Sequence, residues 1–210
     1  MTLDSTISRL GVLGGSFDPP HLGHLHAAEA ALATFNLERV LFIPAARPPH
    51  KPGRRLAAGE QRVELLRLLI NERPEFRVDA RELARAGPSF TADTLREISA
   101  ETSAQLHLIL GTDNLAGLPD WRDVEEILAL AQPIVIHREG NPEELVEALQ
   151  GRLSETALER LRRGLVQDPA VEISSTELRV QLEVGGAHSV LLPKPLADYI
   201  ERAGLYRKLP

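Results

Sequence analysis

Apolar residues along the chain gather in short runs that are separated by longer segments with a different spacing. The runs occupy residues 10–13, 40–43, 76–78, 106–110, 134–136 and 171–173. They are mostly continuous rather than alternating, as in the strands of a parallel sheet that is covered on both faces. The pattern therefore predicts strands at these places.

Between the runs, apolar residues recur at intervals of three and four, which is the spacing of one helix face. Three such stripes are Leu22, Leu25, Ala28, Leu32 and Phe35; Val63, Leu66, Leu69 and Ile70; and Val124, Ile127, Leu128 and Ala131. Residues 142–163 are more polar but keep a helical pattern, so we expect an exposed helical pair there. The stretch 44–59 is rich in Pro and Arg and is typical of a long functional or disordered loop.

Strands that alternate with helices favour right-handed crossovers and a parallel sheet. We therefore predict an α/β fold with a Rossmann-like, doubly wound parallel sheet, whose ligands bind at the carboxyl ends of the strands. Neither an internal repeat nor a linker is evident, so we expect one domain over residues 1–210. Its carboxyl-terminal portion, from about residue 174 to 210, is expected to be helical.

Composition narrows the possible functions. The 210 residues are 43% hydrophobic and 26% charged, as in ordinary globular proteins, and the net charge of −6 argues against a nucleic-acid polymer as partner. The chain has no cysteine, which excludes disulfides, thiolate nucleophiles and cysteine-bound zinc. We see neither a signal peptide nor an apolar run of membrane-spanning length, so we expect a cytoplasmic protein that binds no membrane.

The chemically distinctive segment is residues 14–24, GGSFDPPHLGH, which follows the first apolar run and leads into a helical stripe. Gly14 and Gly15 let the backbone approach a ligand closely, and the helix start offers unpaired N–H groups. His21 and His24 are three residues apart and share one face of the first turn, where their N–H groups can donate to phosphoryl oxygens. The segment predicts a polyphosphate site.

A metal site is a second possibility here, because His26 completes a run of three histidines. On a helix, however, His26 lies about 200° around the axis from His24. Three imidazoles arranged in this way cannot converge on one ion, so no protein-bound metal is predicted.

This segment resembles the GG(T/S)FDPxHxGH motif of the nucleotidylyltransferase superfamily. Further segments follow in order: PPHK at 48–51, RAGPSFTADTL at 85–95, GTD at 111–113 with LPDW at 118–121, and ISSTELR at 173–179. Together they are similar to the bacterial nicotinate mononucleotide adenylyltransferase family over about residues 10–206. The resemblance implies that ATP and nicotinate mononucleotide react to give nicotinate adenine dinucleotide and pyrophosphate.

The resemblance also implies roles for individual residues. The catalytic group is His21, His24 and Arg179. The ATP-binding group is Gly14, Gly15, Ser16, Phe17, Gly23, Gly111, Asp113, Ser175 and Thr176. The mononucleotide-binding group is His50, Lys51, Phe90, Thr91 and Trp121.

Some of these roles have a chemical reason of their own. A carboxylate at Asp113 can accept hydrogen bonds from ribose hydroxyls, and Trp121 is expected to stack on the nicotinate ring. Phe90 stands where relatives often have tyrosine, so recognition of the nicotinate carboxylate by backbone N–H groups is kept while a hydroxyl contact is put in doubt. Asp18 is expected to shape the corner rather than to take part in the reaction.

The reaction needs no general base. A phosphate monoester has its second pKa at about 6 and is mostly dianionic at neutral pH. What it requires is alignment for in-line attack at the α-phosphorus and neutralisation of the oxygen charges. Mg²⁺ is expected because ATP carries it.

Structural alternatives exist for several of these residues: Ser175, Thr176 and Asp113 as helix caps, Trp121 as a core anchor and Lys51 as a solvated loop charge. Two other functions are also open. The pantetheine-phosphate adenylyltransferases share the first motif, although the 89–95 and 118–121 segments speak against them. A nucleotide-binding regulator without activity is disfavoured by the intact His21, His24 and Arg179. The sequence predicts no particular oligomeric state.

Overall fold

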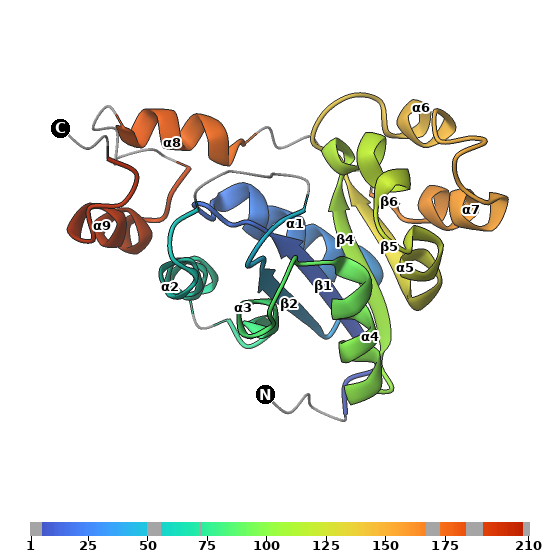
Figure 1. Ribbon diagram of the computed structural model, residues 1–210, viewed down its shortest axis with the longest axis horizontal. Coiled ribbons are helices and arrows are strands. Elements are labelled where there is room, and N and C mark those ends of the chain that lie inside the picture. Colours follow the sequence, from blue (N-terminus) through green and yellow to red (C-terminus); the bar gives the residue numbers. More distant parts are fainter. Residues whose placement is uncertain (1–5, 50–55, 72, 167–172, 184–190, 208–210) are drawn as a thin grey trace.

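A six-stranded sheet forms the centre of the computed structural model, which describes residues 6–49, 56–71, 73–166, 173–183 and 191–207 (Figure 1). The strands are β1 (Arg9–Gly15), β2 (Arg39–Pro44), β3 (Phe76–Val78), β4 (Gln105–Gly111), β5 (Ala131–Ile136) and β6 (Leu165–Val166). Their order is β3-β2-β1-β4-β5-β6, and every neighbouring pair is parallel. The predicted doubly wound parallel sheet is confirmed, and its strand order reverses between β1 and β4.

Helices cover both faces of this sheet (Figure 1). They are α1 (Leu22–Phe35), α2 (Gly59–Ile70), α3 (Arg81–Ala84), α4 (Thr91–Glu101), α5 (Val124–Leu130), α6 (Pro142–Glu147), α7 (Glu155–Arg163), α8 (Ser175–Glu183) and α9 (Lys194–Arg202), with a 3₁₀ helix, η1 (Thr112–Asp120). Successive strand residues point to opposite faces. Thus Val12 packs in the core beneath α4, α5 and α7, and Leu13 packs in the core beneath α1, α2, α8 and α9.

One predicted boundary is wrong, and one predicted strand is not tested. The strand expected at residues 171–173 falls mostly on residues 171–172, which lie outside the described residues, whereas β6 at Leu165–Val166 was not predicted. A two-residue edge strand is too short to produce a pattern, and its position follows from pairing with Val135 and Ile136. Ala131 was placed in a helical stripe but begins β5, because α5 ends one residue earlier and periodicity cannot separate elements joined without a loop.

The carboxyl-terminal portion is helical, as predicted, and it packs onto the sheet. Leu178 on α8 and Leu196 on α9 are both buried against the core beneath α1 and α2. The predicted helical pair at 142–163 is α6 and α7, although Val146 and Leu161 are buried rather than exposed.

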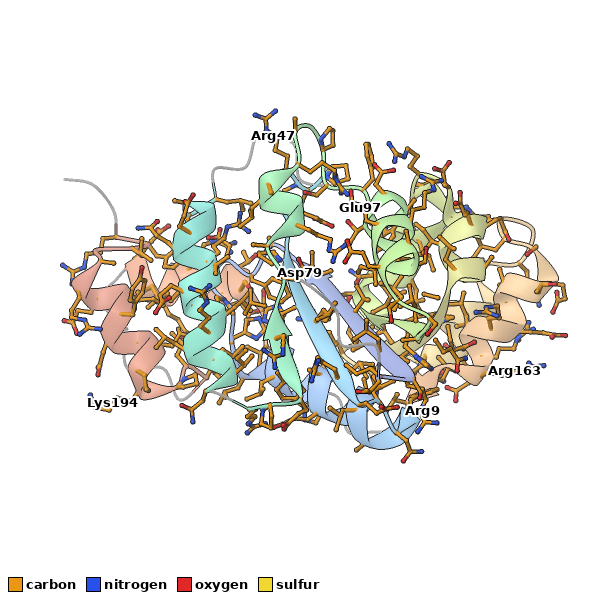
Figure 2. All side chains as sticks on the ribbon, turned by 90° about the horizontal axis from the view of Figure 1, so that it is seen from below. Arg9, Arg47, Asp79, Glu97, Arg163 and Lys194 are labelled. Carbon is orange, nitrogen blue, oxygen red and sulfur yellow. The ribbon has the colours of Figure 1, made fainter. Side chains whose placement is uncertain are left out.

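These two helical regions lie at opposite ends of the molecule, where Lys194 and Arg163 project outward (Figure 2). The assignment of one domain over residues 1–210 stays a prediction. Among the described residues, we find no helix that combines the length and the apolar character needed to cross a membrane.

Candidate active site

The glycine turn at the end of β1 is open on one side and anchored on the other. No atom lies within 4 Å of the place where a Cβ on Gly14 would stand, so the backbone there is accessible to a ligand. Phe17 has a positive φ of 46°, and its ring is buried against His24 and Phe42 at centroid distances of 4.9 and 6.0 Å. The Phe17 side chain therefore anchors the turn, and only its backbone is placed to serve a ligand.

Three carbonyl groups of the turn are covered by donors from distant parts of the chain. The carbonyls of Ser16, Asp18 and Pro19 accept hydrogen bonds from the Arg62 guanidinium (2.8 Å), the Arg179 guanidinium (2.5 Å) and the Ser175 hydroxyl (3.0 Å), respectively. Carbonyl oxygens carry partial negative charge and repel phosphate. With these oxygens held by donors on α2 and α8, the turn is better suited to present its N–H groups to an anion.

The Asp18 carboxylate holds the corner together. It is buried, and its Oδ1 accepts hydrogen bonds from the Ala57 N–H at 3.1 Å and from the Tyr206 hydroxyl at 2.9 Å. Arg62, also buried, donates to the Ala57 carbonyl at 3.0 Å. Burial, together with the Asp18 charge, raises the pKa of Tyr206, so its hydroxyl stays protonated as a donor. These contacts support the expectation that Asp18 shapes the corner.

His21 and His24 share one face of the first turn of α1, as their spacing predicts, with ring centroids 3.8 Å apart. His24 Nδ1 accepts a hydrogen bond from the His21 N–H at 3.2 Å, so neutral His24 carries its proton on Nε2 and can donate it to a phosphoryl oxygen. Burial, with a smaller effect of the Arg138 charge, lowers the pKa of His21 to about 3. His21 is therefore neutral at pH 7, and its buried Nδ1 has no partner among the described residues.

The end of β4 carries the predicted ribose contact. A Cβ on Gly111 would stand 2.1 Å from Asp113 Oδ1, so only glycine lets the Asp113 carboxylate fold back to this position. Asp113 Oδ2 accepts a hydrogen bond from Arg138 at 3.1 Å, and Arg138 also donates to the Ile173 carbonyl at 2.6 Å. Arg138 thus ties the carboxyl ends of β4 and β5 to the segment that leads into α8.

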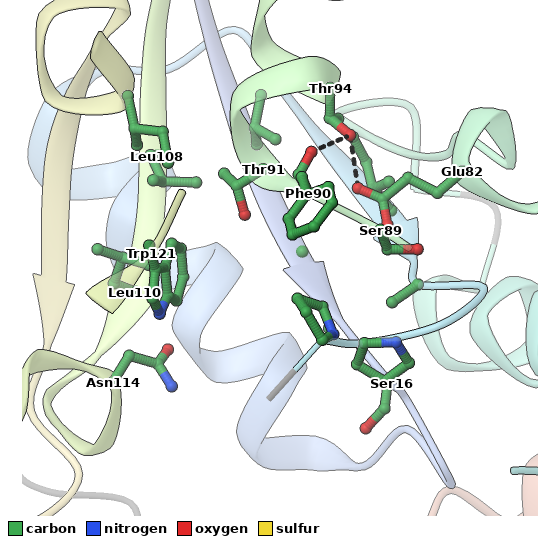
Figure 3. Close-up of a pocket in the computed structure, with 18 of the residues that line it drawn as sticks. Ser16, Glu82, Ser89, Phe90, Thr91, Thr94, Leu108, Leu110, Asn114 and Trp121 are labelled. Carbon is green, nitrogen blue, oxygen red and sulfur yellow. Dashed lines mark hydrogen bonds between the residues drawn. The ribbon is translucent and has the colours of Figure 1, made fainter. Parts of the chain in front are cut away.

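A cavity of about 310 Å³ opens at the carboxyl ends of β1 and β4 (Figure 3). Its lining includes these predicted site residues: Gly14, Gly15, Ser16, Phe90, Thr91, Asp113 and Trp121. Leu108 and Leu110 of β4 form part of an apolar wall. The structure therefore brings the glycine turn and the predicted acceptor-binding residues Phe90, Thr91 and Trp121 to one cavity, at the lower end of the size range for ligand sites.

The other predicted residues that the structure describes are not part of this lining, and they include His21, His24 and Arg179. Thr176 is exposed on α8, and its Oγ1 accepts a hydrogen bond from Arg179 at 2.9 Å. A Cβ on Gly23 would stand 3.0 Å from His21 Nδ1, so this glycine gives the His21 ring its space. His50 and Lys51 lie outside the described residues.

The predicted acceptor end is built on the start of α4. Phe90 precedes the helix and Thr91 is its first residue, and both face the cavity from the side opposite Trp121 (Figure 3). The Ser89 hydroxyl accepts hydrogen bonds from the N–H groups of Ala46 (2.8 Å) and Arg47 (3.2 Å). These bonds fix the start of α4 to the loop that follows β2.

Several residues of the site were not singled out in the sequence. Glu82, Asn114 and Arg122 line the cavity, and Glu82 accepts a hydrogen bond from the Thr94 hydroxyl at 2.6 Å. Arg122 directly follows Trp121, and that position was the one signal for it. Arg62 was not singled out either. Its signal in the sequence is its place beside the apolar stripe of α2, because a charged residue that is buried there needs a polar partner.

Comparisons with known proteins agree with this geometry. Residues 12–181 match the Cytidylyltransferase-like family. A probable nicotinate-nucleotide adenylyltransferase of Rhodopirellula baltica is 38% identical over 199 residues, covering 94% of this chain and 93% of the relative. Another, of Roseiflexus sp., is 40% identical over 198 residues, covering 94% and 98%.

Solved structures show the same fold. Plasmodium falciparum nicotinic acid mononucleotide adenylyltransferase complexed with APC aligns with a TM-score of 0.69 at 18% identity, over 95% of this chain and 97% of that one. The same enzyme complexed with NaAD aligns with a TM-score of 0.68, at the same identity and coverage. At this identity the likeness speaks for the fold alone.

Proposed function

This chain belongs to the cytidylyltransferase-like family, and within it to the nicotinate-nucleotide adenylyltransferases, and from that membership we infer that it transfers the adenylyl group of ATP to nicotinate mononucleotide. The products are nicotinate adenine dinucleotide and pyrophosphate, so the reaction is a step of NAD biosynthesis. The observation that carries this function is that one cavity reaches from residues 14–16 to Phe90, Thr91 and Trp121.

The bond changes are simple. An oxygen of the mononucleotide phosphate attacks the α-phosphorus of ATP and forms a new P–O bond, while the bond from the α-phosphorus to the α,β-bridging oxygen breaks and pyrophosphate leaves. The attacking phosphate is already mostly dianionic at neutral pH, because its second pKa is about 6. The protein therefore has to align the two phosphates and neutralise charge, rather than remove a proton.

We assign the ATP phosphates to the glycine turn and the residues around it. Gly14, Gly15 and Ser16 line the cavity, and we assign the phosphates to backbone N–H groups of this turn, with His24 as an Nε2–H donor beside it. His21 acts as a neutral hydrogen-bonding imidazole, since burial lowers its pKa to about 3. Arg179 adds a positive charge from α8, held next to the turn by its bond to the Asp18 carbonyl.

The ribose of ATP and the acceptor mononucleotide are assigned to other parts of the same site. Asp113 is assigned to ribose hydroxyls, with Arg138 holding its carboxylate. At the other end of the cavity, Trp121 is assigned to the nicotinate ring, and the backbone N–H groups of Phe90 and Thr91 are assigned to its carboxylate. These N–H groups open α4, whose positive dipole end favours an anion.

Mg²⁺ is proposed to enter the site with ATP, held by phosphate oxygens and water, as Mg²⁺ is in most nucleotide sites. The part of the chain that the structure describes contains no group of three or more His, Cys, Asp or Glu side chains that could cage an ion. Bound in this way, Mg²⁺ supplies charge neutralisation on the phosphate oxygens. The cytoplasmic location expected from the sequence belongs to the same proposal.

A pyrophosphate-release assay tests the function. The wild-type protein is expected to release pyrophosphate with ATP and nicotinate mononucleotide together, and not with either alone. Phosphopantetheine serves as the competing acceptor, because the related adenylyltransferase branch uses it. Turnover with phosphopantetheine but not with nicotinate mononucleotide would overturn the assignment.

Catalysis is separated from simple binding by one variant. His24→Ala removes the Nε2–H donor at the turn, and a fall in kcat of about 100-fold or more is expected for loss of a donor to the reacting phosphate. A kcat within twofold of wild type would contradict the role of His24. A nucleotide-binding protein without activity would show nucleotide binding but no pyrophosphate release even before mutation.

A further inference from the structure

The cavity carries few charges, and they are unevenly distributed. Among the described residues that line it, the charged side chains are Glu82, Asp113 and Arg122. Asp113 already faces a cation, Arg138, at the end of β4. Arg122 therefore provides the cationic side chain in this lining, and it lies at the end formed by Phe90 and Trp121.

Arg122 is held in a defined position by three neighbours. Its guanidinium lies over the Phe90 ring, 3.8 Å from the ring centroid, which is a close cation–π contact. It also forms ion pairs with Asp93, in the first turn of α4, and with Asp123, whose Oδ2 lies 3.6 Å from the Arg122 Nε. The side chain is 40% exposed, so the guanidinium is shared between the cavity rim and solvent. Stacking and pairing together orient a planar cation against the entrance of α4.

We propose that Arg122 is a specificity-determining residue that favours an acceptor ring bearing a carboxylate over the same ring bearing an amide. The proposal rests on the function inferred above, in which the ring lies near Phe90, Thr91 and Trp121. A carboxylate carries a full negative charge and an amide carries none, so a nearby guanidinium stabilises the first much more than the second. Phe90 itself contributes no hydroxyl, and Arg122 is the cationic side chain among the described residues that line this end of the cavity.

The negative charges nearby explain why a cation is needed there. Glu82 is buried in the wall of the cavity beside α4, and Asp93 stands in the first turn of that helix. Both repel an anionic ring substituent. Arg122 offsets Asp93 directly through their ion pair. Without Arg122, the described lining at the acceptor end would keep the Glu82 carboxylate but would have no cationic side chain.

The test compares kcat/KM for nicotinate mononucleotide and for nicotinamide mononucleotide in the wild type and in Arg122→Gln. Glutamine keeps polar atoms but removes the charge. The value for the acid is expected to fall about tenfold, in the range for loss of one charge-assisted interaction, while the value for the amide stays within about twofold. Arg122→Lys keeps the charge and is expected to retain most of the preference for the acid.

Arg96→Gln is the matched control. Arg96 also pairs with Asp93, at 3.0 Å, but is not part of the cavity lining. The ratio of its kcat/KM values for the acid and the amide is expected to equal that of the wild type. Thermal unfolding of each variant shows whether the fold is retained.

Equal losses for both substrates in Arg122→Gln, or an unchanged ratio, would overturn the proposal. Failure of the wild type to use nicotinate mononucleotide would instead refute the proposed function, so the two failures are distinguishable. A ratio that also falls in Arg96→Gln would assign the effect to the shared carboxylates of Asp93 and Asp123 rather than to Arg122.

Discussion

Tyr206 follows Asp18 by 188 positions in the chain, yet its hydroxyl donates a hydrogen bond to the Asp18 carboxylate at 2.9 Å. Asp18 is buried in the corner of the glycine turn, and Tyr206 lies in the segment that follows α9. Through this bond the end of the chain supports the turn near its beginning. The turn thus owes its shape to remote residues as well as to its own glycines and prolines.

We expect Tyr206→Phe to remove the hydrogen bond to the Asp18 carboxylate while the aromatic ring keeps its packing contacts. A hydrogen bond to a charged group contributes about 1.5–3 kcal/mol, so unfolding in urea should show a loss of about 2 kcal/mol. The KM for ATP should rise several-fold because the turn is held less firmly. Tyr199→Phe, on α9, is the control. Equal stability losses for the two variants would contradict a specific role for the Tyr206 hydroxyl.

His21 makes stability depend on pH in a defined direction. Burial lowers its pKa from 6.5 to about 3, so between these values the unfolded chain binds a proton that the folded protein does not. The free energy of unfolding is therefore unaffected by the titration of His21 above pH 6.5, and it decreases by about 1.4 kcal/mol per pH unit as the pH falls from 6.5 toward 3. Urea unfolding of wild type and His21→Gln measures this. A curve for His21→Gln parallel to wild type between pH 6 and 4 would rule it out.

Gly111→Ala should impair ATP binding more than folding. The new Cβ would meet Asp113 Oδ1 at 2.1 Å and Arg138 Cδ at 2.6 Å. Both are side-chain atoms that can move, so the fold should survive while the Asp113 carboxylate is displaced. We expect the KM for ATP to rise about tenfold, as for loss of one hydrogen bond to a charged group. In the control Gly59→Ala, the nearest atoms belong to Leu83, and an unchanged KM for ATP is expected. Comparable effects of both variants would count against this reading of Gly111.

Arg138→Gln tests whether the cation between β4, β5 and α8 positions the ATP site. It removes the bonds to Asp113 and to the Ile173 carbonyl. The KM for ATP should rise about tenfold, and the pKa of His21, followed by NMR, should move upward because the Arg138 charge contributes to lowering it. Arg152→Gln breaks an exposed pair with Asp120 and should change neither quantity. A His21 pKa that stays in place would show that Arg138 does not act on it.

The main features of the fold could be read from the sequence because they depend on neighbours in the chain. The strand that ends at Gly15 and the helix that begins at Leu22 were both predicted from residues within a few positions of each other. The spacing of His21 and His24 likewise placed their rings together. The start of β5 at Ala131 and the short β6 were not predicted, because both are set by pairing with a neighbouring strand.

By itself, the sequence determined the doubly wound sheet, the glycine turn after β1 and the family, since apolar periodicity and the local glycine, proline and histidine pattern encode short-range geometry. Only the tertiary structure decided which distant side chains complete the site. Arg62 and Tyr206 reach the turn from α2 and from beyond α9, and Arg122 stacks on Phe90. Such contacts join residues far apart in sequence. They depend on how the helices pack against the sheet, and no local pattern records that packing.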